Sequence, residues 1–125
     1  MRPESVQYLD DSEKAARLIL EFVTGRALAD YESDIFLRSA VDRQFLIVGE
    51  ALTRIRRDEP DLLDTITDSR RIITFRNILA HDYSRVLDLT VWEIIRTQVP
   101  LLIEQVETLR IGRIEEADET RPPSP

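Results

Sequence analysis

Apolar residues recur along most of the chain at the three- and four-residue spacing of helices that bury one face. The clearest run lies mid-chain, where successive members are four, four, three, four and three residues apart: Leu37, Val41, Phe45, Val48, Leu52 and Ile55. Such a stripe predicts an amphipathic helix that packs into a core. Gly49 lies beside Ala51, and the small size of the glycine would let a neighbouring backbone approach closely. We expect this helix to be central, with Asp30 or Ser33 as its N-terminal cap.

Two other segments before residue 86 repeat this helical period. The first runs from Val6 to Thr24, and the following Gly25 predicts its end. Pro60 and its charged neighbours predict the end of the central helix and a connecting loop. After that loop, Thr67 or Asp68 can cap a short, polar helix that we expect to end between residues 82 and 85. The apolar stripes of the first and third helices are Leu9, Ala16, Ile19, Leu20 and Val23, and Ile72, Phe75 and Leu79.

The last helical segment begins where Thr90 and Glu93 have the spacing of a capping box, and Pro100 predicts a kink within it. Its apolar stripe consists of Trp92, Ile95, Val99, Leu102, Val106 and Leu109. After Gly112 the chain becomes acidic and then proline-rich, with too little apolar surface to offset the entropy lost on ordering. We therefore expect one helical domain, residues 1–111, and a disordered tail, residues 112–125. No segment alternates with the period of a strand, so the pattern predicts an all-α, antiparallel up-down bundle of four main helices.

Composition narrows the possible functions of this domain. A chain of 125 residues fits a single core and excludes an enzyme with two lobes around a buried cleft. The absence of Cys and the presence of only three Gly exclude a disulfide scaffold, a thiolate metal site and a Gly-rich phosphate loop. No apolar run approaches the roughly 18 residues of a membrane span, and the first residues lack the pattern of a signal peptide. We expect a cytoplasmic protein with no membrane partner.

The net charge of −7 opposes nucleic-acid binding at long range. The charge is unevenly distributed, because residues 38–85 carry nine Arg against eight Asp and Glu, a local net of +1. The remaining residues carry eight basic and sixteen acidic side chains, a net of −8. The middle of the chain is therefore neutral to basic, and a site for RNA there is compatible with the acidic whole.

Residue types that carry chemistry cluster between residues 76 and 83: Arg76, Asn77, Tyr83 and the only histidine, His81. At about 100° per residue, Arg76 and Tyr83 share one helix face, and Asn77 and His81 share the neighbouring one. Arg76 and His81 are separated by roughly 140°, so one continuous helix would not easily direct both at the same phosphate. Either the helix frays near His81, or two subunits combine at one cleft. We favour a symmetric dimer.

These residue types suit the cleavage of RNA by its own 2′-hydroxyl. His81 can move the proton, since imidazole exchanges protons near neutral pH, and Arg76 can stabilise charge on the phosphorus. Asn77 would orient His81 or a phosphate oxygen through its amide. Simpler interpretations stay open: Arg76 as an ion-pair partner of Asp82 or a bundle carboxylate, His81 and Asn77 as helix surface, and Tyr83 as a half-buried bundle residue.

The segment Arg76-Asn77-Ile78-Leu79-Ala80-His81-Asp82-Tyr83 resembles the Arg-x4-His-x-Tyr signature of the HEPN superfamily, in particular the HepT-like ribonuclease toxins of prokaryotic toxin–antitoxin pairs. Ile47-Val48-Gly49-Glu50-Ala51 is similar to the Ile-Gly-Glu-Ala segment of that family, and residues 91–102 resemble its last helix. The resemblance extends in order from Tyr8 to Leu109. The loop of residues 59–70 departs from it, because it lacks the Pro-Trp pair that precedes the motif helix in many relatives.

The resemblance implies a helical bundle, a homodimer whose motifs face each other across a cleft, and an endoribonuclease that needs neither metal nor cofactor. By position, Arg76 and His81 become the catalytic pair and Asn77 a supporting residue. Tyr83 falls on the tyrosine to which a nucleotidyltransferase antitoxin adds AMP in type VII toxin–antitoxin systems; the anionic addition would repel RNA. The alternatives are a non-catalytic module that binds a nucleotide or a nucleotidyltransferase, and a structural helical dimer without a ligand.

Overall fold

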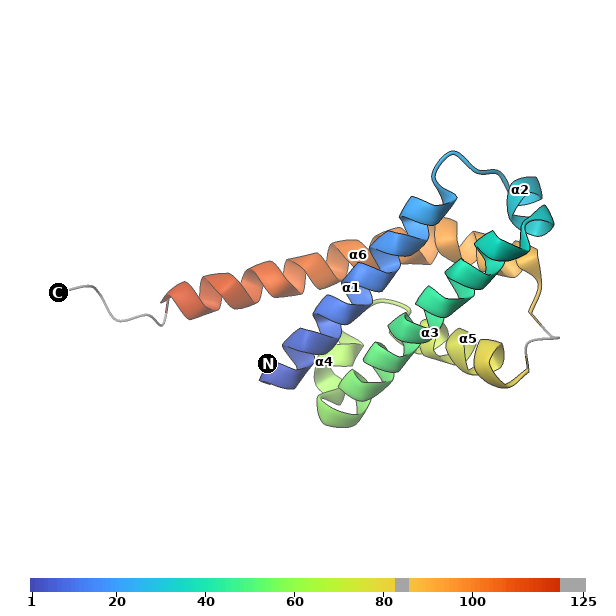
Figure 1. Cartoon of the computed structure of the whole chain (residues 1–125). Coiled ribbons are helices and arrows are strands. Elements are labelled where there is room, and N and C mark those ends of the chain that lie inside the picture. Colours follow the sequence, from blue (N-terminus) through green and yellow to red (C-terminus); the bar gives the residue numbers. More distant parts are fainter. Residues whose placement is uncertain (83–85, 120–125) are drawn as a thin grey trace.

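The computed structural model of the chain describes residues 1–82 and 86–119, with side chains as far as residue 112 (Figure 1). The described residues form helices and no strands: α1 (Pro3–Val23), α2 (Leu28–Ser33), α3 (Ile35–Asp58), α4 (Pro60–Asp64), α5 (Ser69–His81) and α6 (Asp88–Glu119). The prediction of an all-α fold is confirmed. None of these helices is both long and apolar enough to span a membrane within the part of the chain that the structure describes.

The long helices pack around one core. Figure 1 shows α1 and α3 running side by side in opposite directions, while α6 also packs on α1 and projects beyond the other helices toward its C-terminal end. α5 packs on α3. The six stripe positions of α3 are all buried, as are those of α5 and every stripe position of α6 except the partly buried Leu109. The stripes predicted from the helical period therefore form the core.

The start of α3 differs from the prediction. Asp34, rather than Asp30 or Ser33, caps the helix, because its carboxylate accepts the backbone N–H groups of Phe36 at 3.0 Å and Leu37 at 3.1 Å. Asp30 accepts instead from the backbone N–H of Ala27 at 2.7 Å, at the start of the short helix α2. Two separate helices thus replace the single capped segment that we expected.

Three other boundaries also differ. Pro60 begins the short helix α4 where we predicted only a loop, because proline has no N–H and the first helical position does not need one. α6 begins at Asp88, so Thr90 lies inside its first turn and is not its cap. α6 also continues past Gly112 to Glu119, beyond the expected start of the tail. The division at residue 112 stays a prediction, and residues 120–125 lie outside those described.

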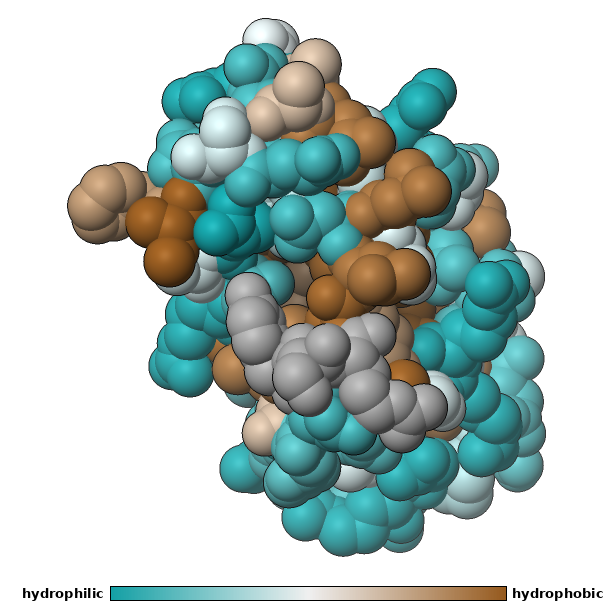
Figure 2. Space-filling view, turned by 90° about the vertical axis from the view of Figure 1, so that its right-hand side faces the viewer, coloured by the Kyte–Doolittle hydropathy of each residue, from teal (hydrophilic) through white to brown (hydrophobic). Residues whose placement is uncertain are grey.

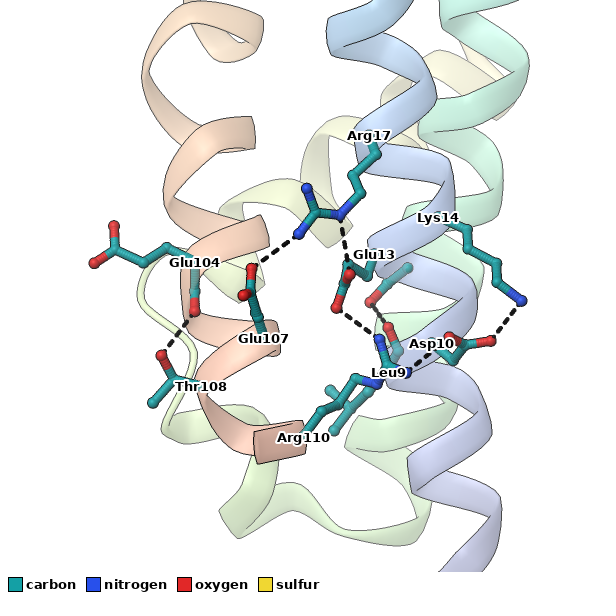
Figure 3. A network of polar contacts seen from close by, with 10 residues as sticks. Leu9, Asp10, Glu13, Lys14, Arg17, Glu104, Glu107, Thr108 and Arg110 are labelled. Carbon is teal, nitrogen blue, oxygen red and sulfur yellow. Dashed lines mark hydrogen bonds and ion pairs between the residues drawn. The ribbon is translucent and has the colours of Figure 1, made fainter. Parts of the chain in front are cut away.

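Charged side chains join the middle of α1 to the later turns of α6 (Figure 3). Glu13 accepts hydrogen bonds from Arg17 at 2.9 Å and from Arg110 at 2.8 Å. Arg17 also reaches Glu107 at 2.9 Å, and Arg110 reaches Asp10 at 3.3 Å. Burial acts to raise the pKa of Glu13, but the two arginines lower it more, so the pKa lies below its ordinary value. This network holds α6 against α1 as far as Arg110.

Candidate functional site

Arg76 lies on α5 where that helix packs closely on α3. The rings of Phe45 and Phe75 meet edge to face with centroids 5.0 Å apart, which fixes the two helices against each other. One turn along α3, a Cβ atom added at Gly49 would lie only 2.2 Å from Cγ of Arg76 and 2.3 Å from its Cβ. The space that glycine leaves is therefore occupied by the arginine stem. A close approach at Gly49 is therefore present, but the approaching group is the Arg76 side chain and not the backbone that we predicted.

The guanidinium of Arg76 is held by two neighbours. Its Nη2 donates to Oε2 of Glu50 at 3.0 Å, and its Nη1 donates to Oδ1 of Asn77 at 3.1 Å. Its Nε is buried and has no hydrogen-bond partner among the described residues. The Arg76 side chain is 23% exposed, so the guanidinium is oriented by protein contacts and is still reachable from solvent. Of the simpler interpretations of Arg76, pairing with a bundle carboxylate is thus found.

Glu50 connects Arg76 to a second arginine. Its other carboxylate oxygen, Oε1, accepts from Nε of Arg54 at 3.0 Å. The guanidinium of Arg54 lies over the ring of Tyr8, 5.8 Å from the centroid, in a cation–π contact between α3 and α1. The chain Tyr8, Arg54, Glu50, Arg76 therefore links α1, α3 and α5. Glu50 is not among the site residues predicted from the sequence, although its four-residue spacing from Arg54 indicated an ion pair.

A cleft of about 480 Å³ opens beside Arg76. It lies between α1, α3 and α5, and its lining combines apolar side chains with three arginines and two carboxylates, Arg43, Arg54, Arg76, Asp11 and Glu50. Cavities of a few hundred cubic ångströms with apolar walls and a few polar groups are typical small-ligand sites. The cleft is therefore the natural place for part of a ligand that also touches Arg76.

His81 is the exposed last residue of α5 and is not among the residues that line this cleft. The helix does not fray before it, because the backbone N–H of Asp82 still donates to the carbonyl of Ile78 at 2.8 Å. Arg76 and His81 thus stand five residues apart on one continuous helix, roughly 140° apart around its axis. Of the two arrangements considered from the sequence, fraying near His81 is not seen as far as that residue, where α5 ends, and the dimer stays a prediction.

The other two predicted site residues have different outcomes. Asn77 is exposed, and its amide oxygen holds Arg76 rather than His81. Tyr83 lies outside the described residues. The structure thus brings Arg76 and Asn77 together, adds Glu50 to them, and leaves His81 on a different side of α5 from the cleft.

Large apolar side chains are exposed at the end of the bundle where α3 and α6 begin. They are Ile35, Phe36, Leu87 and Leu89, with exposed fractions of 62%, 85%, 67% and 56%. We call them the apolar end residues. Figure 2 views the molecule from this side and shows apolar side chains gathered there among polar ones. Exposed apolar residues in such numbers at one end of a small domain are typical of an interaction surface.

Comparison with known proteins places the chain in a family. The family model named Ribonuclease HepT-like matches residues 12–109. The "Probable ribonuclease HepT" of Thermococcus cleftensis is 31% identical over 110 residues, which cover 88% of this chain and 99% of that protein. A "Putative RNase" of Methanocaldococcus jannaschii is 27% identical over 100 residues, 80% of this chain and 91% of that protein. No solved structure gives a significant match. Because the family model spans most of the helical domain, with α3, α5, Arg76 and His81 inside the match, the chain belongs to the HepT-like ribonuclease family.

Proposed function

We propose that the chain is a metal-independent endoribonuclease that cleaves RNA through attack of a 2′-hydroxyl on the adjacent phosphate. The observation that carries the proposal is the state of Arg76: its guanidinium is oriented by Glu50 and Asn77, is partly exposed, and borders a cleft. A fixed guanidinium beside a cleft can stabilise the charge that develops on phosphorus in the transition state. Membership of a ribonuclease family supports RNA as the substrate.

In this reaction the 2′-oxygen forms a bond to phosphorus and the bond from phosphorus to the 5′-oxygen breaks. The products are a 2′,3′-cyclic phosphate and a 5′-hydroxyl, and no water is consumed. One proton leaves the 2′-hydroxyl and one is delivered to the departing 5′-oxygen. Imidazole can perform both transfers, and we assign them to His81. Because the substrate supplies the nucleophile, DNA should not be cleaved.

We propose further that the working unit is a symmetric dimer. The unbroken helix α5 places Arg76 and His81 on different sides of one axis, so a second copy is the simplest source of a histidine near the Arg76 cleft. The exposed apolar end residues supply surface that a second copy could bury. Mixing tests the arrangement: Arg76→Ala and His81→Ala proteins should each be inactive, and a refolded mixture should recover activity because a mixed dimer holds one intact pair. A mixture as inactive as its components would contradict a shared site.

Cleavage itself is tested with purified wild type, His81→Ala and Thr74→Ala incubated in EDTA with a labelled RNA and its all-deoxy counterpart. Thr74 is an exposed residue of the same helix, so its variant is the matched control. We expect wild type and Thr74→Ala to cut RNA only, and His81→Ala to be slower by about 10²- to 10⁴-fold while its circular dichroism is unchanged. Equal cleavage by His81→Ala would refute the assignment of the proton transfers.

We also propose that a cognate nucleotidyltransferase neutralises the enzyme, as the family resemblance implies, so that the pair acts as a toxin and its antitoxin. The phenolic oxygen of Tyr83 would attack the α-phosphorus of ATP, forming a Tyr–AMP ester and releasing pyrophosphate and a proton. The added negative charge close to His81 would repel RNA. Tyr83 follows His81 by two residues, so the addition would fall beside the proposed site.

The second candidate function is a non-catalytic module that binds a nucleotidyltransferase or a nucleotide. The net charge of −7 favours it, because an acidic protein attracts RNA poorly at long range. Absence of cleavage across a broad RNA pool, combined with capture of the nucleotidyltransferase by the wild-type chain, would select this candidate over the ribonuclease.

A further inference from the structure

We infer that Glu50 is a positioning residue of the ribonuclease site and acts by fixing the guanidinium of Arg76; the inference rests on the proposed function. Glu50 lies on α3, 26 residues before Arg76 in sequence, and the two side chains meet at 3.0 Å between helices. Neither the motif of residues 76–83 nor its spacing includes this carboxylate. It joins the site only through the packing of α3 on α5, where Gly49 admits the stem of Arg76.

Some N–H groups of the Arg76 guanidinium donate to acceptors in the described part of the chain, and others do not. A guanidinium has five N–H bonds: one on Nε and two on each terminal nitrogen. Glu50 takes one N–H of Nη2, Asn77 takes one of Nη1, and Nε is buried. Among the described residues, one N–H on each terminal nitrogen therefore remains for a phosphate. Glu50 occupies a single donor and fixes the direction of the others.

Glu50 is itself held on both carboxylate oxygens, although its side chain is 45% exposed. Its Oε2 is held by Arg76 and its Oε1 by Arg54, both at 3.0 Å, and Arg54 rests over the ring of Tyr8. One carboxylate between two guanidinium groups leaves a local charge of +1, so Glu50 orders Arg76 without cancelling its attraction for an anion. A residue that only neutralised Arg76 would not need the second arginine.

The kinetic signature follows from where Arg76 acts. RNA is bound through several phosphates, so ground-state affinity depends little on one guanidinium, whereas transition-state charge at one phosphorus depends on its placement. Loss of Glu50 should therefore lower kcat and change KM by less than about twofold. Displacement of a catalytic group by about 1 Å can cost 10²-fold, which we take as the effect of Glu50→Ala. Glu50→Gln keeps an oxygen acceptor, so we expect an intermediate loss of about tenfold.

The test compares wild type, Glu50→Ala, Glu50→Gln and Glu93→Gln for kcat and KM on one RNA. Glu93 is an exposed residue of α6, and its variant makes the same change in net charge, which controls for the general effect of charge on RNA binding. The order wild type, Glu50→Gln, Glu50→Ala in kcat, with KM and thermal midpoint nearly constant, supports the inference. A kcat of Glu50→Gln equal to that of Glu93→Gln, or a loss confined to KM, overturns it.

A second measurement does not require cleavage. The heteronuclear NOE of the Arg76 Nε–H reports side-chain order on the picosecond to nanosecond scale, and its resonance is assigned as the one missing from Arg76→Lys. We expect an ordered value in wild type and in Glu93→Gln, and a clear drop in Glu50→Ala. If Arg76 stays equally ordered without Glu50, the positioning role is wrong. If wild type cleaves no RNA while the NOE drops as expected, the proposed ribonuclease fails and the control of Arg76 by Glu50 stands.

Discussion

Replacing Gly49 by alanine removes the space that the Arg76 side chain occupies on α3. The added Cβ would lie 2.3 Å from Cβ of Arg76 and 2.2 Å from its Cγ, whereas carbons in contact stand about 3.5–4.0 Å apart. Because Cβ of Arg76 is bonded directly to the backbone of α5, rotation about χ1 cannot move it. Relief requires α5 itself to shift away from α3 by roughly 1 Å or more.

The size of the effect follows from two opposing contributions. Overpacking a tight contact costs about 1–3 kcal/mol, and we take the upper end because two carbons clash and one is fixed to the backbone. Replacement of glycine by alanine inside a helix returns about 1 kcal/mol through propensity. We therefore expect Gly49→Ala to lower the free energy of unfolding by about 2 kcal/mol. It should also lower kcat, because the shift of α5 carries Arg76 away from Glu50.

The chain supplies its own control at Gly112. This glycine lies inside α6 with nothing within 4 Å of an added Cβ, so Gly112→Ala should stabilise by up to about 1 kcal/mol. Urea unfolding followed by circular dichroism, at one protein concentration, gives both values. If Gly49→Ala is as stable as wild type, or gains as much as Gly112→Ala, the contact between Gly49 and Arg76 does not constrain the site as argued.

Further predictions concern the scaffold and the modified tyrosine. Glu13→Gln should lower the free energy of unfolding by about 2 kcal/mol at pH 7, because it weakens the bonds from Arg17 and Arg110. Since the folded pKa of Glu13 is lowered, this contribution is present in full above the ordinary pKa of the group and is lost as the pH falls through the folded pKa. The urea midpoints of wild type and Glu13→Gln should therefore converge in acid. Asp34→Ala should cost about 1 kcal/mol through loss of the α3 cap, and an unchanged urea midpoint would contradict this. Tyr83→Phe should abolish the AMP mass that the nucleotidyltransferase and ATP add to wild type, and the addition of AMP to another residue would refute the assignment.

The stripes of the core were predictable because a helix that buries one face leaves a period of 3.6 residues in the sequence. The helix boundaries were harder to predict, because Asp30, Ser33 and Asp34 can all cap a helix and the local sequence does not show which of them does. The choice is made by packing. Tyr31 is buried with its ring 5.6 Å from that of Trp92, which gives α2 its own anchor and leaves Asp34 to begin α3.

In the candidate site, too, some residues could be predicted from the sequence and others could not. Arg76, Asn77 and His81 could be named because their residue types lie within a few positions on one helix. Glu50 appeared only within the segment that resembles Ile-Gly-Glu-Ala. Its place in the site could not be predicted, because its contact with Arg76 arises from the packing of two helices and involves residues far apart in sequence. Gly49 gave a partial signal: its small size indicated a close approach, but only the fold shows which side chain fills the space.

The central claim is tested most directly by the chemistry of the cut ends. Wild-type protein is incubated with RNA in EDTA, and the products are analysed by mass spectrometry. Attack by the 2′-hydroxyl predicts fragments that end in a 2′,3′-cyclic phosphate and begin with a 5′-hydroxyl. They should form at the same rate without EDTA and about 10²- to 10⁴-fold more slowly with His81→Ala. Fragments with 3′-hydroxyl and 5′-phosphate ends, or cleavage that EDTA abolishes, would contradict attack by the 2′-hydroxyl with Arg76 and His81 as the catalytic pair.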